Sequence, residues 1–350
     1  MPATEATVAV VDPTRDPQWD ELISRFAAAT VFHNVGWARV LQESYGYAPL
    51  YLVAGNGDNV SAVLALMEVK SWLTGRRGVS LPFTDECNVL ASDEGSARLV
   101  TERAMRLGRE RMWKGVEMRG TGGRFVSAET MGGSFLGHQL DLRIGEQALF
   151  GRVASPVRRA IRKAEREDCR IQVERTPLAL RTYYGLHCLT RKRHGLPPQP
   201  WSFFAGIQRH LFQMNGGFVV LSYSRDQPVA GAVFLCHGRH AIYKYGASNL
   251  AFQNLRANNL VMWEAIRWLV QNGFETLSFG RTAVQNDGLR RFKLGWGTAE
   301  YPISYQEFDY RKNGYVVGAD EAYGWHNAIF SRLPIWLSRV AGACLYRHWA

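Results

Sequence analysis

The clearest pattern of apolar and polar positions lies between Phe218 and Trp296. Apolar runs of strand length flank the polar turn at 225–228, so we expect two paired antiparallel strands there. From Leu260 to Val270 the apolar residues recur at helical spacing, and an Asn-Gly pair follows as a typical helix stop. One more strand and a loop ending in Phe292-Lys293 complete the region. The pattern predicts a hairpin, a further strand, an amphipathic helix, another strand and a loop.

The first half of the chain shows a similar order of elements. Apolar runs at 51–54 and 60–64 flank a turn rich in Gly and Asn, which predicts another hairpin. A helical stretch ends near Lys114-Gly115 and leads into Val116-Glu117-Met118, as the later helix leads into 277–279. Hairpins of this kind also arise by chance, but the repeated order is consistent with an internal duplication.

Between the two halves, and again at the end of the chain, the pattern predicts helices. Ser155-Pro156 is a typical helix start, because proline at the first helical position loses no hydrogen bond that the helix needs. We expect a basic helix from there to Arg166, which opens the second domain. Further helices are predicted from Leu178 to Arg193 and from Trp201 to Met214. The segment 325–349 is predicted to be an amphipathic basic helix that either lies in a membrane interface or docks against the second domain.

Composition agrees with a folded protein of two domains. The chain has 350 residues, of which 46% are hydrophobic and 21% are charged. The net charge is +11, and part of the excess lies in two runs, 158–166 and 191–193. Such runs favour anionic partners, namely tRNA, a nucleotide-linked sugar, a lipid pyrophosphate or an acidic membrane surface. A solvated helix face explains the first run equally well.

The cysteines and the apolar stretches bear on the location of the protein. The five cysteines are scattered without a CxxC pair, which argues against a disulfide framework and a zinc site and favours a reducing compartment. The N-terminal segment carries acidic residues and lacks the long apolar core of a secretory signal. No stretch approaches about 18 uninterrupted apolar residues. We expect a cytoplasmic protein, peripheral at the inner face of the membrane if its tail binds there, with no metal ion or redox cofactor.

Several segments occur in an order and at a spacing that are found in a known family. They are Phe32–Trp37 with Tyr45–Tyr47, Ser80–Asp85, Val157–Arg166, Tyr183–Pro197, Phe279–Arg281 and Phe292–Trp296. Together they resemble the FemAB branch of the GNAT superfamily, and within it the members associated with exosortase (PEP-CTERM) and exopolysaccharide gene clusters, which carry a BioF2-like acetyltransferase domain. The resemblance implies a mixed α/β (α+β) fold of two tandem GNAT-like domains, each a mostly antiparallel mixed sheet flanked by helices. The implied domains are 1–150 and 151–318, followed by the basic tail 319–350.

The sequence departs from the family pattern at two points. CoA-dependent members of the superfamily hold the pyrophosphate on backbone amides at a helix start, through a loop of the type (Q/R)xxGx(G/A). The corresponding stretch here, Gln253–Asn259, contains no glycine, which argues against the usual mode of CoA binding, although Arg256 could pair with a phosphate. The chain also lacks a long charged heptad insertion like the coiled-coil arm of some FemAB enzymes, so the basic surfaces would have to hold a tRNA donor.

The resemblance also assigns candidate site residues. Transfer of an acyl or aminoacyl group to an amine needs a nearby carbonyl and stabilisation of the developing oxyanion. The resemblance implies that Lys293 supplies that charge, and that Phe292 walls the site and excludes water. It further implies that Arg193 and Tyr245 contact an anionic acceptor. Without it, these four would be explained as a solvated lysine beside a core phenylalanine, an arginine at a helix end and a core-facing tyrosine. Arg281 follows a strand expected to end near the cleft and is a further candidate for substrate contact.

The expected function is transfer of an acyl or aminoacyl group to an amine of a cell-envelope or exopolysaccharide-related precursor, such as a peptidoglycan-like precursor. The acceptor is expected to be anionic and lipid-linked, and the donor co-substrate to be acyl-CoA or aminoacyl-tRNA. Two alternatives stay open: an acyl-CoA-dependent N-acyltransferase of GNAT type, and a non-catalytic module that binds an envelope precursor. Nucleic-acid binding by the basic surface is a third, and steep salt dependence would be its sign.

Overall fold

The computed structural model of the chain describes residues 7–56, 59–120, 133–316 and 326–349. Contacts between Cα atoms divide the chain into two compact units. Unit 1 comprises the described residues of 1–135, 302–320 and 346–350, and unit 2 comprises those of 136–301 and 321–345. The chain passes from unit 1 to unit 2 within strand β9 (Gly133–Asp141) and returns within strand β15 (Ala299–Asp309). The domain limits expected at residues 150 and 318 stay a prediction.

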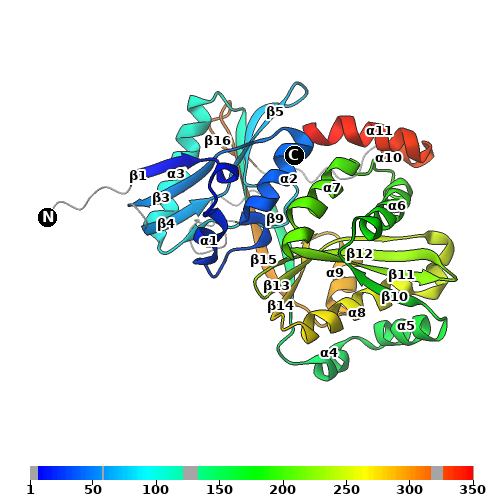
Figure 1. Cartoon of the computed structure of the whole chain (residues 1–350). Helices are drawn as coiled ribbons and strands as arrows, with labels where there is room; N and C mark the ends of the chain where they lie inside the picture. The colour runs from blue at the N-terminus through cyan, green and yellow to red at the C-terminus, as the bar shows by residue number, and fades with distance from the viewer. Residues whose placement is uncertain (1–6, 57–58, 121–132, 317–325, 350) are drawn as a thin grey trace. The chain divides into compact units, whose positions relative to one another are not determined.

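Unit 1 consists of two groups of strands and three α-helices (Figure 1). One group follows the order β1-β3-β4-β7, and the other follows β15-β8-β6-β5-β2, with β16 paired to β15. The strands are β1 (Thr7–Val11), β2 (Ala48–Pro49), β3 (Tyr51–Asn56), β4 (Asn59–Leu64), β5 (Met67–Ser71), β6 (Gly75–Val79), β7 (Leu90–Ala91), β8 (Gly115–Arg119) and β16 (Gly314–Val316). The α-helices are α1 (Trp19–Ser24), α2 (Val35–Tyr45) and α3 (Glu94–Glu110).

The elements predicted for the first half are present in unit 1. The predicted hairpin is formed by β3 and β4, which pair antiparallel, while the turn residues 57–58 lie outside the described residues. The predicted helix is α3, which ends at Glu110 and leads into β8. Its buried side chains Val100 and Ala104 belong to a core that also contains residues of β3 and β4. The helix therefore forms where its apolar face can be removed from water against these strands.

Unit 2 is built on the strand order β10-β11-β12-β13-β14-β9, antiparallel from β10 to β13 and parallel between β13 and β14. Its remaining strands are β10 (Arg170–Glu174), β11 (Gly217–Ser224), β12 (Gln227–His237), β13 (His240–Ser248) and β14 (Thr276–Ala283). The helices are α4 (Glu146–Arg152), α5 (Ser155–Arg166), α6 (Pro177–Arg193), α7 (Trp201–His210), α8 (Ala257–Gln271), α9 (Asp287–Leu294), α10 (His326–Arg332) and α11 (Ile335–Leu345). Figure 1 shows α6 and α7 on one face of these strands, and α8, α5 and α4 on the other.

Each face of the unit 2 sheet has its own apolar core. On the α8 face the rings of Phe218 and Phe234 stack with centroids 5.0 Å apart, in one cluster with Leu269 of α8. On the α6 face Phe204 packs against Tyr245, with ring centroids 5.7 Å apart. Because both faces are covered, β11 and β12 are apolar on both sides, and this is why they appear in the sequence as nearly continuous apolar runs.

A β-bulge in β13 decides which of its side chains faces which core. The register places Val233 opposite Tyr245 and Phe234 opposite Tyr243, so Lys244 is the extra residue. In a regular strand, residues two apart share one face. Across the bulge, Tyr243 packs against Phe234 on the α8 face, whereas Tyr245 lies on the α6 face. The two tyrosine side chains therefore pack in different cores, on opposite faces of the sheet.

The structure corrects the extent of one predicted helix and the nature of one predicted loop. The helix expected over Trp201–Met214 ends as α7 at His210, and a separate 3-10 turn follows. Phe292-Lys293, expected at the end of a loop, lies in helix α9. This helix is capped by Asn286, whose side chain accepts a hydrogen bond of 3.0 Å from an amide of the first turn. By contrast, the basic helix predicted from Ser155 to Arg166 is confirmed as α5.

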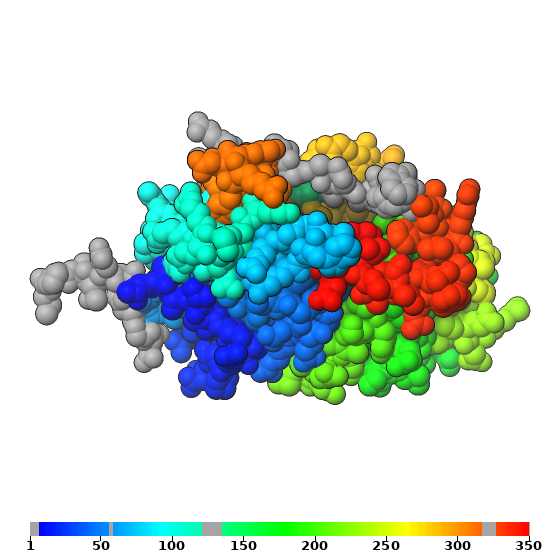
Figure 2. Space-filling view, turned by 90° about the horizontal axis from the view of Figure 1, so that it is seen from above, coloured from blue at the N-terminus to red at the C-terminus, as the bar shows by residue number. Residues whose placement is uncertain are grey.

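The tail forms two helices, α10 and α11, on either side of Pro334, because proline interrupts helical hydrogen bonding. Both helices contact α6, so the docking alternative describes this part of the tail. Large apolar side chains nevertheless stay exposed on the outer side of these helices: Ile329 is 50%, Trp336 64% and Val340 56% exposed. Figure 2 shows α10 and α11 at the surface beside α6.

Candidate active site

Strands β13 and β14 stop pairing partway along their length, and a cavity lies against the part of β13 beyond that point. Their paired register covers only His240–Ile242 and Thr276–Ser278. The cavity has a volume of about 190 Å³. Residues of α6, β12, β13, α8 and α9 line it: Thr190, Arg193, His194, Gly231, Ala232, Tyr243, Gly246, Ala247, Ser248, Asn258, Val261, Met262 and Phe292. Helices from both faces of the sheet therefore meet at one small hollow.

Tyr243 and Gly246 shape the β13 wall of this cavity. A Cβ atom at position 246 would collide with the Tyr243 hydroxyl, so glycine is needed there to let the ring approach the strand. Burial raises the pKa of Tyr243 to about 12, so the hydroxyl keeps its proton at neutral pH and can donate a hydrogen bond. The end of β13 is fixed to α6, since the Thr190 hydroxyl donates to the carbonyl of Ser248 (3.1 Å) and accepts from its amide (2.9 Å).

The last turn of α6 places a cation at the cavity. Arg193 lines it, with its guanidinium 3.4 Å from Nε2 of His194, the cap residue that follows the helix. Burial, followed by the charges of Arg193 and Arg191, lowers the pKa of His194, so this imidazole is neutral at pH 7 and can accept from the guanidinium. Within the described part of the chain no carboxylate lies within 4 Å of Arg193. Its charge is therefore available to an anionic ligand.

The N-terminus of α8 is the second feature of the cavity that suits an anion. The helix begins at Ala257, and Asn258 in its first turn lines the cavity. The preceding residue, Arg256, has a left-handed φ of +61°, which costs a non-glycine residue about 1 kcal/mol. This is the stretch where the resemblance placed a glycine-containing loop. The backbone thus keeps a conformation typical of glycine although the residue is an exposed arginine.

The two residues of the predicted pair Phe292-Lys293 have different positions and different contacts. Phe292 is 36% exposed and forms part of the cavity wall. Lys293 is only 3% exposed, and its Nζ donates to the carbonyl oxygens of Gly280 (2.9 Å) and Arg281 (2.8 Å). Its ammonium therefore ties α9 to β14. Among the described residues, the cavity lining includes Phe292 but not Lys293.

The other two predicted residues lie away from the lining. Tyr245 packs on the α6 face against the rings of Phe203 and Phe204, with centroids 6.2 and 5.7 Å away. It lies on the opposite face from Tyr243 because the bulge at Lys244 comes between them. Arg281 contributes its backbone carbonyl to the lysine contact, and its half-buried side chain has interactions of its own. The structure thus brings together Arg193 and Phe292 at the cavity, with Arg256 two residues before the lining residue Asn258.

One buried histidine, His138, was not predicted from the sequence, although the charge of Lys293 acts on it. His138 on β9 is fully buried, and neither ring nitrogen has a hydrogen-bond partner among the described residues. Glu300 Oε1 lies 3.7 Å from its Nδ1, but this carboxylate already accepts two hydrogen bonds of 2.8 Å from Arg290. Burial, and next the charge of Lys293, lowers the pKa of His138 to about 4. A lone histidine in a strand carries no motif that would single it out.

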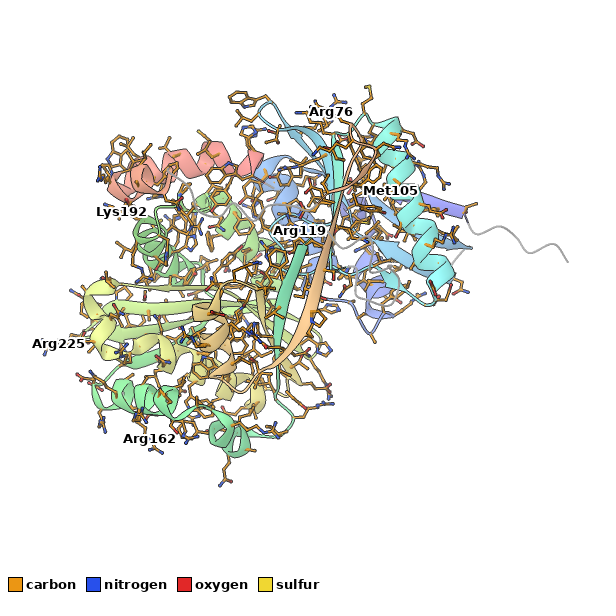
Figure 3. All side chains as sticks on the ribbon, turned by 180° about the vertical axis from the view of Figure 1, so that it is seen from behind. Arg76, Met105, Arg119, Arg162, Lys192 and Arg225 are labelled. Carbon is orange, nitrogen blue, oxygen red and sulfur yellow. The ribbon has the colours of Figure 1, made fainter. Side chains whose placement is uncertain are left out.

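The two basic runs lie on different faces of unit 2. Figure 3 shows Arg162 on α5 and Lys192 on α6, and α5 packs against α8 while α6 contacts the opposite face of the sheet. Part of the first run is structural, since Arg158 donates to the carbonyls of Gly151 (2.9 Å) and Val153 (2.6 Å). Of the two runs, only the one on α6 reaches the cavity, through Arg193.

The described residues show neither a metal site nor a membrane span. No group of three or more His, Cys, Asp or Glu side chains in these ranges could hold a metal ion. The described helices are all too short or too polar to cross a membrane. All five cysteines are free thiols.

Comparison with known proteins agrees with this architecture. Residues 151–301 match the family model described as "Acetyltransferase (GNAT) domain". The crystal structure of FemX superposes with a TM-score of 0.64 at 13% identity, over 85% of this chain and 96% of FemX. L-PGS from Bacillus licheniformis gives 0.52 at 13% identity, over 93% and 97% of the two chains. A tandem GNAT protein from the clavulanic acid biosynthesis pathway gives 0.52 at 12% identity, over 87% and 98%.

A search among curated protein sequences gave no match. The structural likenesses, at 12–13% identity, show the fold alone, and the family match runs from the end of α4 to the start of β15. Both agree with the mixed fold and tandem GNAT-like arrangement expected from the sequence. Residues 151–301 therefore match the GNAT domain model, and the chain shares the fold of FemX and of the tandem GNAT protein.

Proposed function

We propose that this protein is an acyl- or aminoacyltransferase that moves an acyl group onto an amine of a cell-envelope or exopolysaccharide-related precursor. The observation that carries the proposal is the cavity beside the parted strands β13 and β14, lined by Arg193 and by the first turn of α8. A cation and a helix N-terminus at one hollow suit anionic substrates. The GNAT domain and the FemX-like fold support acyl transfer as the class of reaction.

In the proposed reaction the neutral amine attacks the donor carbonyl and a C–N bond forms. The bond to the leaving sulfur or oxygen breaks, and the proton lost by the nitrogen ends on that leaving atom, giving a free thiol or hydroxyl. The developing oxyanion needs hydrogen-bond donors or positive charge beside it. The protonated Tyr243 hydroxyl lines the cavity and is proposed as one such donor. Lys293 is proposed to contribute its charge from the carbonyls of Gly280 and Arg281, and Phe292 to exclude water.

The size of the cavity bears on the group that is transferred. Its volume of about 190 Å³ lies below the roughly 300 Å³ at which pockets for drug-sized ligands begin. We therefore expect a small acyl or aminoacyl group in the cavity rather than a long acyl chain. Arg193 is proposed to bind the anionic part of the acceptor, and Tyr245 and Arg281 to support the site through packing and the backbone.

Acyl-CoA as the donor is the second candidate, and Arg256 favours it. This residue adopts the left-handed conformation at the N-terminus of α8, so the backbone turn that glycine would provide is kept. The arginine side chain could pair with a phosphate of the donor. Aminoacyl-tRNA stays the alternative donor, and the anionic lipid-linked acceptor, the cytoplasmic location and the link to exosortase clusters stay predictions.

The donor is tested by calorimetric titration of the full chain with acetyl-CoA and desulfo-CoA. Saturable binding supports an acyl-CoA donor, whereas no binding by protein with a normal melting transition favours aminoacyl-tRNA. Arg256→Gly keeps the left-handed turn without the charge, and Arg256→Lys keeps a charge. If Arg256 pairs with a phosphate, the glycine variant binds CoA about tenfold more weakly and the lysine variant loses less.

The reaction itself is tested by mass spectrometry of amino-sugar nucleotides incubated with the protein and each donor. An N-acylated product that disappears in Arg193→Gln supports the proposed transferase. Acceptor binding without any product from either donor would instead identify a binding module.

A further inference from the structure

A second cavity lies between α6 and α11, on the outer side of the helix that also lines the candidate active site. Its volume is about 530 Å³, within the range of small-molecule sites. It shares no lining residue with the first cavity among the described residues. An inference about it is therefore independent of the proposed transferase reaction.

Two arginines at this groove are held in place by aromatic rings. The guanidinium carbon of Arg181 lies 4.6 Å from the ring centroid of Trp201, and that of Arg339 lies 5.3 Å from the ring of Tyr184. The two rings are themselves in contact, with centroids 5.2 Å apart. Stacking on a ring fixes the plane of a guanidinium and leaves its N–H groups directed outward.

Neither guanidinium has a charge partner among the residues that the structure describes. No carboxylate of the described residues lies within 4 Å of Arg181 or Arg339. Other arginines of unit 2 do have such partners, for example Arg239 with Glu275 at 3.0 Å. Two stacked, uncompensated guanidiniums on one groove are suited to bind a phosphate or carboxylate through paired hydrogen bonds.

Part of the groove is apolar, beside the polar side chains of Thr182, Gln227 and Asn249. Leu186, Leu189 and Ile335 line it, and Leu189 is 38% exposed. Next to these residues along α11, Trp336 and Val340 expose 64% and 56% of their surface. Exposed apolar surface of this kind gains free energy when an alkyl chain covers it, at about 25 cal/mol per Å². A nucleic acid would leave this surface uncovered, whereas an amphiphile would use both the charge and the apolar wall.

We propose that the α6–α11 groove binds an anionic lipid, with its phosphate or carboxylate between Arg181 and Arg339 and its acyl chain along Leu186, Leu189 and Ile335. The lipid is thereby held on the helix that carries Arg193 at its C-terminal end. The site would hold the protein at an anionic membrane through a defined pocket, in addition to the general positive charge of the chain.

The first test uses dodecyl phosphate below its micellar concentration, titrated into the full chain by calorimetry. Saturable binding is expected, and Arg181→Gln with Arg339→Gln should weaken it at least about tenfold, since hydrogen bonds to charged groups are lost. Arg159→Gln with Arg166→Gln is the matched control, because it removes the same charge from exposed positions on α5. Equal weakening by both pairs, or inorganic phosphate binding as tightly as dodecyl phosphate, would overturn the proposal.

Gly185 offers a second variant that fills the groove. It lines the cavity, and a Cβ added there meets no atom within 4 Å, so a larger side chain can enter the empty space. Gly185→Leu should abolish dodecyl phosphate binding while the melting temperature stays the same or rises, because leucine favours a helix over glycine. Binding that persists in this folded variant excludes the groove as the site.

Vesicles then identify the source of the ligand. The protein should co-sediment with phosphatidylcholine vesicles that contain phosphatidylglycerol, and less with phosphatidylcholine alone. Gly185→Leu should reduce the difference, whereas Arg159→Gln with Arg166→Gln should not. If the protein binds dodecyl phosphate in the groove but ignores anionic vesicles, the groove serves a soluble amphiphile and the proposed membrane lipid is wrong.

Discussion

At the scale of single residues, Lys293 links the structure of unit 2 to its proposed chemistry. Its ammonium donates to one buried and one partly buried carbonyl, so Lys293→Ala leaves both without this donor and should lower the free energy of unfolding by about 1–3 kcal/mol. Lys293→Met should do the same with less loss of packing. If the charge also stabilises the oxyanion, kcat should fall about 100-fold in both variants.

Urea unfolding and single-turnover rates separate these two roles of the lysine. A rate that falls only in proportion to the folded fraction would show that Lys293 is structural. Leu294→Ala, at an exposed position of the same helix, is the matched control and should change neither quantity appreciably.

The lowered pKa of His138 predicts how the free energy of unfolding depends on pH. The pKa of this side chain is about 4 in the folded protein and about 6.5 in the unfolded chain. Between these values the unfolded chain binds more protons, so the free energy of unfolding should fall as the pH is lowered from about 6.5 towards 4. His138→Leu should flatten part of this fall, which urea midpoints at pH 7 and 4.5 would measure. His187, whose pKa is also lowered, to about 3, is still present in the variant. The free energy of unfolding of the variant should therefore still decrease at low pH, but by less. An identical fall in wild type and variant would contradict the assignment.

At the scale of elements, local periodicity is enough to predict the hairpins and the helices α5 and α8, because each depends on residues close in sequence. The features that make the site depend on contacts between distant segments. The bulge at Lys244 follows from the pairing of β12 with β13 and separates Tyr243 from Tyr245, so alternation along the strand misplaces one tyrosine. The left-handed conformation of Arg256 could not be predicted from the sequence either, since arginine rarely adopts it.

The ends of the units are also set by distant contacts. Residues before 151 belong to the core of unit 2, including Leu140, Leu142 and Leu149, which are all at most 3% exposed. The sequence shows these leucines only as part of a strand and a short helix. Their partners lie on α5, α8 and the strands that follow, more than ten residues further along the chain. Contacts of this kind between distant segments leave no local pattern in the sequence, so the composition of the core of unit 2 could not be predicted from periodicity.

At the scale of the whole molecule, the net charge of +11 makes a prediction that distinguishes the two donors. A tRNA donor must neutralise several phosphates, and a protein with 6–10 phosphate contacts loses about 10³–10⁵ in affinity between 50 and 200 mM salt. Acyl-CoA carries few phosphates, so its affinity should change about tenfold or less over the same range. The measurement is the donor KM at a series of salt concentrations.

The same series shows which basic run is involved. Since the runs of α5 and α6 lie on different faces of unit 2, one bound tRNA need not contact both. Arg159→Gln with Arg166→Gln lowers the salt slope only if the donor crosses the α5 face, by nearly one unit for each phosphate that these arginines neutralise. Lys192→Gln makes the corresponding test on α6, where the run adjoins the cavity-lining Arg193. A shallow slope that neither change alters would exclude tRNA as the donor, and acyl-CoA would then be the donor that fits both the charge and the size of the cavity.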